Sequence, residues 1–367
     1  MATTLTADLA RRAPKVLLHD HLDGGVRPGT IADIAAEIGY DRLPSLDPSH
    51  LEEWFVVNTP GAGLVKYLEG FTHTTAVMQT REHLQRVAAE CAIDLARDGV
   101  VYAEVRFAPE QHLERGLRAH QVVEAVLDGF AQGQKTAALE GHTIVVRTLI
   151  SAMRQAHHSE EMARLAVEFR DEGVCGFDIA GPEDGFPPTD HLNAFQLIRR
   201  ENFHLTIHAG EAFGLPSIWE ALQFCGAERL GHGVRIIDDV DLTSERPRLG
   251  RLSNYVRDRR IPLEVCPTSN VHTGASPSFG EHPIEVLRRL RFRVTVNTDN
   301  RLMSGIALSD EFVAGARHFG WTLEDMEWFT LNAAKSTFFP FDQRLAMINQ
   351  IIKPRFAALR AEVEQAL

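Results

Sequence analysis

Apolar residues follow two alternating patterns along this chain. Short, β-rich apolar runs are separated by longer segments in which apolar positions recur at helical spacing, and this alternation predicts strands connected by helices. We predict strands at residues 16–22, 100–109, 143–153, 175–181, 204–210, 229–234, 262–270 and 293–299. We predict intervening helices at residues 82–98, 119–140, 159–172, 190–202, 217–225, 247–260 and 282–289, and two further helices after the last strand at 309–319 and 322–336.

The order of these elements predicts the fold class. Eight strands interleaved with helices in a chain of 367 residues are typical of an α/β fold with a parallel (β/α)8 barrel, the TIM barrel. An open, doubly wound sheet is the alternative. Such sheets often open with a GxGxxG turn that binds a dinucleotide, and no such turn follows an early strand here.

Two segments exceed the barrel pattern, although we still predict a single domain over residues 1–367. Residues 23–99 are too many for one crossover between strands, and they predict extra helices at 30–38 and 49–55. An insertion after the first strand lies on the C-terminal face of a barrel, where active sites form, so we expect it to include a partial lid. Residues 341–367 predict a C-terminal helical extension.

Histidine and aspartate side chains recur where the predicted strands end. His19 and His21 are two residues apart, so both point into the barrel while Asp20 points away. His208 ends the fifth strand and Asp299 ends the eighth. Each residue alone has an ordinary explanation, such as a core histidine or a helix cap. Because the strand ends meet at the barrel mouth, three imidazoles and a carboxylate together suit zinc or a similar divalent metal.

Two further groups at these strand ends can move protons. Glu211 lies three residues beyond His208, and His232 ends the sixth strand between two glycines. Metal-assisted hydrolysis needs one group for the proton of water and another to protonate the substrate. Taken singly, Glu211 could be a carboxylate at a helix N-terminus and His232 a buried structural histidine. The combination favours a hydrolase.

Composition narrows the classes of partner. The chain has 38 basic and 50 acidic residues and a formal net charge of −12, which argues against nucleic-acid binding and gives no support for a membrane surface. Its four cysteines form no CxxC pair, so they indicate neither a disulfide framework nor a cysteine zinc site. With no signal-peptide pattern and no apolar run of spanning length, we expect a cytoplasmic protein. Its oligomeric state stays open.

Several motifs, taken as a set, carry a family resemblance. They are HDHLDG at 19–24, YAEVR at 102–106, HAGE at 208–211, GHG at 231–233, VCPTSN at 265–270 and NTD at 297–299. In this order, over residues 15 to about 341, they resemble the adenosine deaminase family of the amidohydrolase superfamily.

The resemblance implies a reaction and a ligand set. The reaction is hydrolytic removal of the 6-amino group of a purine, with release of ammonia and with water activated by the metal. Glu211 would protonate N1 of the ring, His232 would take or hold the proton of the water, and Asp299 would orient that water. The resemblance implies one zinc ion per chain, held by His19, His21, His208 and Asp299.

The resemblance also implies the substrate contacts. Gly181 matches the position whose backbone N–H meets purine N3, Asp23 matches a residue that contacts the ribose 5′-hydroxyl, and His21 borders the substrate. Asn300 stands where many members carry an aspartate that contacts N7. An amide donates at any pH, whereas a carboxyl group must be protonated to do so. The implied substrate is a small purine nucleoside, adenosine or 2′-deoxyadenosine, in purine salvage or catabolism.

Several alternatives stay open at this point. Free adenine or a 5′-modified nucleoside, such as an aminodeoxyfutalosine-like compound, could be the substrate, whereas Asp23 would repel the phosphate of a nucleotide. Other hydrolases of the superfamily bind two metal ions, and they usually place a bridging lysine or acid at the end of the fourth strand. Asp178 is the only nearby candidate here, and we interpret it as structural. A catalytically inactive nucleoside-binding barrel would be expected to lose Glu211, His232 or a ligand, and all are present.

Overall fold

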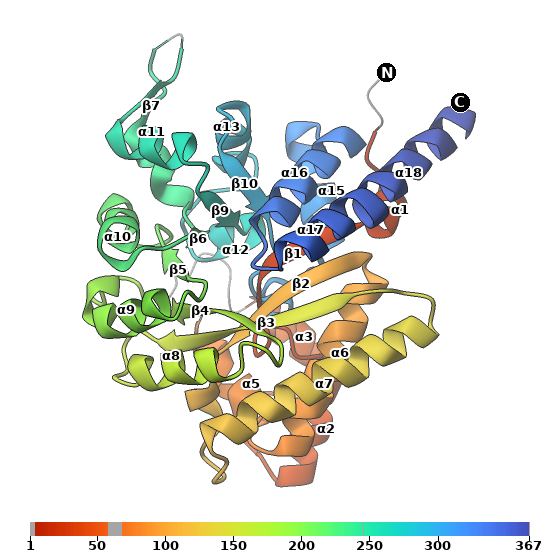
Figure 1. Ribbon diagram of the computed structural model, residues 1–367. Helices are drawn as coiled ribbons and strands as arrows, with labels where there is room; N and C mark the ends of the chain where they lie inside the picture. Colours follow the sequence, from red (N-terminus) through yellow and green to blue (C-terminus); the bar gives the residue numbers. More distant parts are fainter. Residues whose placement is uncertain (1–3, 58–67, 245, 367) are drawn as a thin grey trace.

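The computed structural model describes residues 4–57, 68–244 and 246–366 (Figure 1). Eight parallel strands of the described chain form two four-stranded sheets, ordered β1-β2-β3-β4 and β10-β9-β6-β5. The strands are β1 (Lys15–His21), β2 (Val100–Phe107), β3 (Val145–Met153), β4 (Val174–Ala180), β5 (Thr206–Ala209), β6 (Arg229–His232), β9 (Pro262–Val265) and β10 (Arg293–Val296).

Two narrow seams join these sheets into one ring. At the first seam, the segment just before β5 pairs with Phe177 of β4. At the second, Asp20 of β1 pairs with Asp299 just beyond β10. The N–H of Asp299 donates to the carbonyl of His19 at 2.9 Å, and the N–H of His21 donates to the carbonyl of Asp299 at 2.8 Å. The predicted (β/α)8 architecture is confirmed, and its second seam runs through candidate site residues.

Helices cover the outside of the ring (Figure 1). The longer ones are α2 (Pro28–Ile38), α3 (Pro48–Val57), α6 (Arg81–Arg97), α7 (Ala119–Leu139), α8 (Ser159–Glu168), α9 (Leu192–Arg200), α11 (Arg251–Asp258), α15 (Leu308–Phe319), α16 (Leu323–Ser336) and α18 (Lys353–Ala366). The shorter ones are α1 (Ala7–Arg12), α5 (Phe71–Ala76), α10 (Leu215–Glu220), α12 (Pro267–His272), α13 (Ile284–Arg289), α14 (Arg301–Ser304) and α17 (Phe341–Ala346). Short 3-10 helices are η1 (Leu68–Gly70), η2 (Pro109–His112), η3 (Pro188–His191) and η5 (Val234–Asp239), and short π-helical segments are η4 (Ala221–Cys225) and η6 (Met347–Ile352).

The C-terminal extension is helical, as predicted. It consists of α17, η6 and α18, and residue 367 lies outside the described residues. Helix α18 lies alongside α1 at the start of the chain (Figure 1), and Arg12 Nη1 donates to Glu362 Oε1 at 2.9 Å across this contact. Among the helices that the structure describes, none combines the length and the apolar character required to cross a membrane.

The segment between β1 and β2 holds the extra helices expected of an insertion. Helices α2 and α3 match the predicted 30–38 and 49–55, and α5 and α6 follow. Residues 58–67, inside the predicted lid, lie outside the described residues. Phe71 and Thr72 of α5 line the cavity described below, so the insertion supplies part of its wall. The action of residues 23–99 as a lid and the single-domain organisation stay predictions.

Among the boundaries that differ from the sequence prediction, three have a clear local cause. The predicted strand 262–270 ends at Val265, because Pro267 begins α12, and a helix tolerates proline in its first turn. The predicted strand 293–299 ends at Val296, and Asp299 has a left-handed φ of 59°, which interrupts regular pairing. The predicted helix 247–260 begins only at Arg251, since β8 (Arg248–Leu249) pairs antiparallel with β7 (Val240–Asp241).

The centre of the barrel holds charged side chains. Arg106 donates to Asp178 at 3.1 Å and to Glu264 at 2.7 Å, and Arg229 pairs with Glu264 at 2.6 Å and with Glu104 at 2.7 Å. A lone charge would be strongly disfavoured in such an interior, so each charge is tolerated because the group is paired and hydrogen-bonded. Asp178 and Glu264 also reach the candidate site, and the core therefore supports the chemistry at the barrel mouth.

Glu311 on α15 predicts a pH dependence of stability. It is fully buried; Oε1 accepts the N–H of Thr268 at 2.9 Å, while Oε2 has no hydrogen-bond partner among the described residues. Burial raises the pKa of Glu311 from 4.5 to about 8. The folded state therefore binds this proton more tightly than the unfolded state. Its contribution to stability is present below pH 4.5 and is lost as the pH rises through about 8.

Glu311→Gln keeps the acceptor for Thr268 and removes this titration. We expect the free energy of unfolding of the variant to exceed that of the parent by about 4–5 kcal/mol at pH 9, and by only about 1 kcal/mol at pH 5. Urea unfolding at both pH values measures the difference. Glu52→Gln, at an exposed position on α3, is the control and should show no pH-dependent gain. Equal differences at both pH values would show that the pKa of Glu311 is not raised in the folded protein.

Candidate active site

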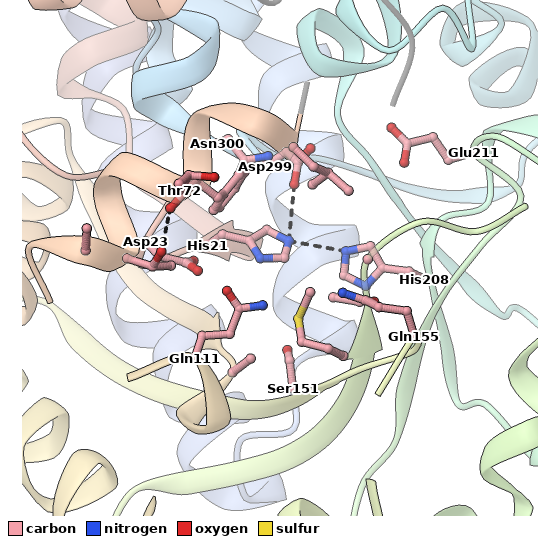
Figure 2. A pocket seen from close by; sticks show the side chains of 18 of the residues that line it. His21, Asp23, Thr72, Gln111, Ser151, Gln155, His208, Glu211, Asp299 and Asn300 are labelled. Atoms are coloured by element: carbon pink, nitrogen blue, oxygen red, sulfur yellow. Dashed lines mark hydrogen bonds and ion pairs between the residues drawn. The ribbon is translucent and has the colours of Figure 1, made fainter. Parts of the chain in front are cut away.

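A cavity of about 360 Å³ opens at the C-terminal ends of the barrel strands. Its volume lies within the range of about 300–1,000 Å³ that is typical of small-molecule sites. Figure 2 shows His21 and His208 facing one another near its centre, with Glu211 and Asp23 on opposite sides of them. The cavity is therefore long enough to place different groups at its two ends.

Candidate ligand atoms lie at the spacing of a shared coordination sphere. His21 Nε2 is 3.2 Å from His208 Nε2 and 3.3 Å from Asp299 Oδ1 (Figure 2). Asp299 Oδ1 is also 3.3 Å from His19 Nε2. Atoms bound tetrahedrally to zinc at about 2.0–2.1 Å lie roughly 3.3–3.4 Å from one another. The backbone thus holds these donors as they would stand around one ion.

His232 belongs to the same cluster. Ligand atoms of His19, His208, His232 and Asp299 all lie within 4.8 Å of one another, and all four residues are buried. His19 Nε2 has no hydrogen-bond partner among the described residues, which fits a role as a ligand. The structure therefore brings together the four predicted ligands and places His232, predicted for proton chemistry, directly beside them.

Buried carboxylates orient two of the imidazoles. Glu264 Oε2 lies 3.0 Å from His19 Nδ1, and Asp178 Oδ2 lies 3.0 Å from His208 Nδ1, so the Nε2 atom of each ring faces the cluster. Burial lowers the pKa of His19 to about 4, which favours the neutral, metal-binding ring. Because Asp178 is engaged by His208 and Arg106, its interpretation as structural fits better than a second-metal ligand. Glu264 has no role in the sequence-based prediction, although an acid inside an apolar run is a signal of a buried polar contact.

Two cluster residues have strained backbones. His232 has a φ of 62° and Asp299 a φ of 59°, in the left-handed region that costs ordinary residues about 1–2 kcal/mol. Ser269 Oγ donates to Asp299 Oδ2 at 2.6 Å. Asp20, expected to point away from the barrel interior, is buried and accepts from Arg301 Nε at 3.0 Å. These contacts hold the seam in the conformation that aims Asp299 at the histidines.

Glu211 lies on the turn after β5, outside the predicted ligand set. Thr273 Oγ1 donates to Glu211 Oε1 at 2.8 Å, and Glu211 Oε2 is 3.5 Å from His232 Nε2. Gly210 makes the turn with a φ of 80°. Burial raises the pKa of Glu211 above its ordinary value, which favours the protonated form required of a general acid.

A second carboxylate, which sequence reasoning missed, holds this turn. Glu183 accepts the backbone N–H groups of Gly210 at 2.6 Å, Glu211 at 3.0 Å, Ala212 at 2.6 Å and Phe213 at 3.0 Å. Four donors on one buried carboxylate define the path of the chain between β5 and α10. The only local signal was an acid just beyond the predicted fourth strand.

Glu183→Gln should misplace Glu211. The amide keeps one acceptor oxygen and turns an NH2 group towards the other N–H groups, and losing a charged hydrogen bond costs about 1.5–3 kcal/mol. We expect a kcat about 10–100-fold lower, since small misplacements of a catalytic group have effects of this size, with the metal content unchanged. Asp98→Asn is the control, because buried Asp98 also accepts a backbone N–H, from Ser309 at 3.0 Å, away from the cavity. An unchanged kcat in Glu183→Gln would contradict this role.

The remaining predicted residues lie on the cavity wall. Asp23, Gly181 and Asn300 all line it, and Oδ1 of both Asp23 and Asn300 is buried without a hydrogen-bond partner in the described chain. Burial raises the pKa of Asp23 to about 7. Gly181 has a φ of 108°, and a Cβ atom there would come within 2.6 Å of Gln155 Oε1. The wall thus offers a ligand unpaired polar atoms and, at Gly181, a backbone that no side chain covers.

Comparison with known proteins agrees with this geometry. The sequence model of the adenosine deaminase family matches residues 14–354. Adenosine deaminase 1 of Streptomyces coelicolor is 61% identical over 363 residues, 99% of this chain and 92% of that protein. The adenosine deaminase of Mycobacterium tuberculosis is 58% identical over 365 residues, 99% of this chain and 100% of that protein.

A solved structure extends the agreement to the fold. An amidohydrolase from Burkholderia ambifaria with bound Zn superposes with a TM-score of 0.81 at 23% identity, covering 98% of this chain and 96% of that chain. At that identity the likeness concerns the fold alone. The family match and the two relatives lead to one conclusion: the chain belongs to the adenosine deaminase family of hydrolases.

Proposed function

We propose that this protein is a zinc-dependent enzyme that hydrolyses adenosine and 2′-deoxyadenosine to inosine and 2′-deoxyinosine, with release of ammonia, in purine salvage or catabolism. One observation carries the proposal. A buried cluster of metal-ligand atoms meets a carboxyl group, Glu211, 3.5 Å from His232 in a single cavity. The names of the close relatives support the same reaction.

The donor set fits one zinc ion, which His19, His21, His208 and Asp299 would hold. Three neutral imidazole nitrogens and one carboxylate oxygen are ligands that zinc prefers. When bound, zinc supplies a Lewis acid that lowers the pKa of water towards neutrality. The other carboxylate oxygen of Asp299 accepts from Ser269 at 2.6 Å, which keeps the side chain aimed so that it can orient the water.

Glu211 carries the proton chemistry. In its protonated form it gives a proton to N1 of the purine, which makes C6 a better electrophile. Water adds to C6, and the C6–N bond then breaks. Of the two protons of the water, one restores Glu211 and the other leaves with the amino group as ammonia, so that atoms and charges balance.

The two ends of the cavity suit the two ends of a nucleoside. Glu211 and Asp23 lie on opposite sides of the His21–His208 pair (Figure 2). With the ring edge at Glu211, the ribose 5′-hydroxyl would meet Asp23. Gly181 would offer its N–H to N3, and Asn300 would donate its amide to N7.

Asn300→Ala tests the N7 contact. The variant loses one hydrogen bond worth about 0.5–1.5 kcal/mol, so we expect kcat/KM on adenosine to fall up to about tenfold. Metal content should stay at the parental level, because Asn300 is outside the ligand set. Asn300→Asp is the companion variant, since its carboxyl group can donate only when protonated and activity should then fall as the pH rises. Unchanged kinetics in both variants would remove Asn300 from the site.

A substrate panel tests the proposed function as a whole. The change in ultraviolet absorbance of the purine and the release of ammonia are measured with adenosine, 2′-deoxyadenosine, adenine, AMP and a 5′-modified adenosine. Glu211→Gln is the control for contaminating enzymes. We expect the highest kcat/KM with the two nucleosides. No turnover with any compound would overturn the deaminase assignment, whereas adenine or the 5′-modified compound as the best substrate would change only the substrate.

AMP is included in the substrate panel because a cation lines the cavity. Arg42 lines the cavity, is exposed, and stacks on Tyr40 with its guanidinium carbon 5.1 Å from the ring centroid. The guanidinium of Arg42 would attract a 5′-phosphate, whereas the carboxylate of Asp23 would repel it. Preferred turnover of AMP would assign the 5′ end of the substrate to Arg42 and overturn the nucleoside preference.

A further inference from the structure

A chain of hydrogen bonds leads from the backbone of α13 to the far side of His232. The N–H of Ile284 donates to His282 Nδ1 at 3.1 Å. His282 Nε2 lies 3.3 Å from Asn270 Oδ1, and Asn270 Nδ2 lies 3.1 Å from His232 Nδ1. His232, Asn270 and His282 are all at most 2% exposed, so bulk water does not compete for these bonds.

The direction of every bond in this chain follows from its first member. A backbone N–H can only donate, and that of Ile284 is free because it begins a helix, so His282 Nδ1 must accept. Burial lowers the pKa of His282 to about 3, so the ring is neutral and carries its single proton on Nε2. That proton goes to the oxygen of Asn270, which turns the NH2 group of the amide towards His232.

We propose that Asn270 and His282 are positioning residues that hold His232 as the tautomer protonated on Nε2. Because Nδ1 accepts from Asn270, the neutral ring has its proton on the nitrogen that faces Glu211 and the metal-ligand cluster. His232 therefore donates a hydrogen bond at the reaction centre. The sequence-based expectation was that His232 would take or hold the proton of the water, and a ring already protonated on Nε2 excludes the first of these two roles.

The tautomer of His232 refines the proposed function. It rests on that function only for the role of the Nε2–H donor in the reaction. An N–H group aimed at the attacking oxygen stabilises the negative charge that develops there during addition to C6. The proton of the water must then go to a carboxylate, and Glu211 is free to take it once it has protonated N1. His232 Nε2 and Glu211 Oε2 are 3.5 Å apart, close enough for both to act on one oxygen.

The tautomer can be read without any measurement of activity. Histidine is labelled with 15N, and two-bond 1H–15N spectra are recorded on metal-free and on zinc-loaded protein; the His232→Phe variant identifies the signals that disappear. We expect Nε2 of His232 to show the shift of a protonated nitrogen and Nδ1 that of an unprotonated one. A proton on Nδ1 in the parent protein would overturn the inference, even if adenosine is turned over.

Asn270→Asp reverses the bond with nearly the same shape. A carboxylate can only accept, so we expect the His232 proton to be drawn to Nδ1, and kcat to fall about 10²–10³-fold while KM changes little, as when an oxyanion donor is lost. An unchanged tautomer in this variant would overturn the inference. The parent spectrum keeps the test decisive even if the buried carboxylate prevents folding.

His282 offers a matched set of variants. His282→Leu removes the donor to Asn270 and should lower kcat and mix the two His232 tautomers, whereas His282→Gln can donate from its amide and should restore both. His83→Leu is the control, because His83 is 7% exposed and pairs with Glu37 on the outer helices. Equal effects in His282→Leu and His282→Gln on tautomer and kcat would reject the positioning role.

Discussion

Glu211→Gln is expected to lower kcat on adenosine by about 10²–10⁴-fold, the usual contribution of a general acid. The amide has the same shape and keeps the oxygen that accepts from Thr273 at 2.8 Å, so the turn should be preserved. It cannot give a proton to N1 or regain one from water. Steady-state kinetics and metal analysis of the same preparation measure the effect.

The metal content of Glu211→Gln separates chemistry from assembly. We expect one ion per chain, as in the parent, because Glu211 lies outside the predicted ligand set. Glu211→Asp is the matched comparison, since it keeps the acid but places it one methylene group further from the ring. Its kcat should lie between those of the parent and the glutamine variant. A kcat within about threefold of the parent in fully metal-loaded Glu211→Gln would contradict the role of an acid that contributes at least about 10²-fold.

His208→Ala is expected to abolish both metal binding and turnover. His208 Nε2 is 3.2 Å from His21 Nε2, and its loss leaves the cluster with one imidazole fewer. Metal per chain after gel filtration and kcat on adenosine are the measurements. His204→Ala is the control, because His204 is four residues earlier, is exposed and pairs with Glu228 at 3.0 Å.

Asp178→Asn gives the graded counterpart. Asp178 holds the Nδ1 side of His208 at 3.0 Å, and loss of such a partner typically weakens metal affinity 10–100-fold. Competition with a chromophoric chelator measures the affinity, and thermal unfolding shows whether the core survives the loss of the Arg106 partner. A full metal complement in His208→Ala, or parental affinity in folded Asp178→Asn, would contradict the ligand assignment.

The barrel and its candidate ligands could be predicted from the sequence because their signals are local. Strand and helix periods are visible within a window of ten to twenty residues, and the order of the elements restricts the topology. Once parallel strands are placed in a ring, their C-terminal ends must converge. His19, His208 and Asp299 could therefore be brought together although they are distant in the chain. The boundary errors at residues 265, 296 and 251 arose where a proline, a left-handed aspartate and a two-residue strand pair ended the regular pattern.

The groups that support the site depended on the tertiary structure. Glu264 meets His19 across 245 residues of sequence, Glu183 meets the Glu211 turn across 27 or more, and Asn270 meets His232 across 38. Such hydrogen bonds leave no period in the sequence, and an acid or an amide at each position has many local explanations.

By itself, then, the amino-acid sequence determined the order of the elements, the barrel architecture and the residues that meet at its mouth, since these follow from short-range patterns and chain topology. Only the folded chain decided the orientation of each imidazole, the placement of Glu211 by Glu183, and the nitrogen of His232 that carries the proton. These depend on distances of about 3 Å between buried polar atoms, and a hydrogen bond exists only at such a distance.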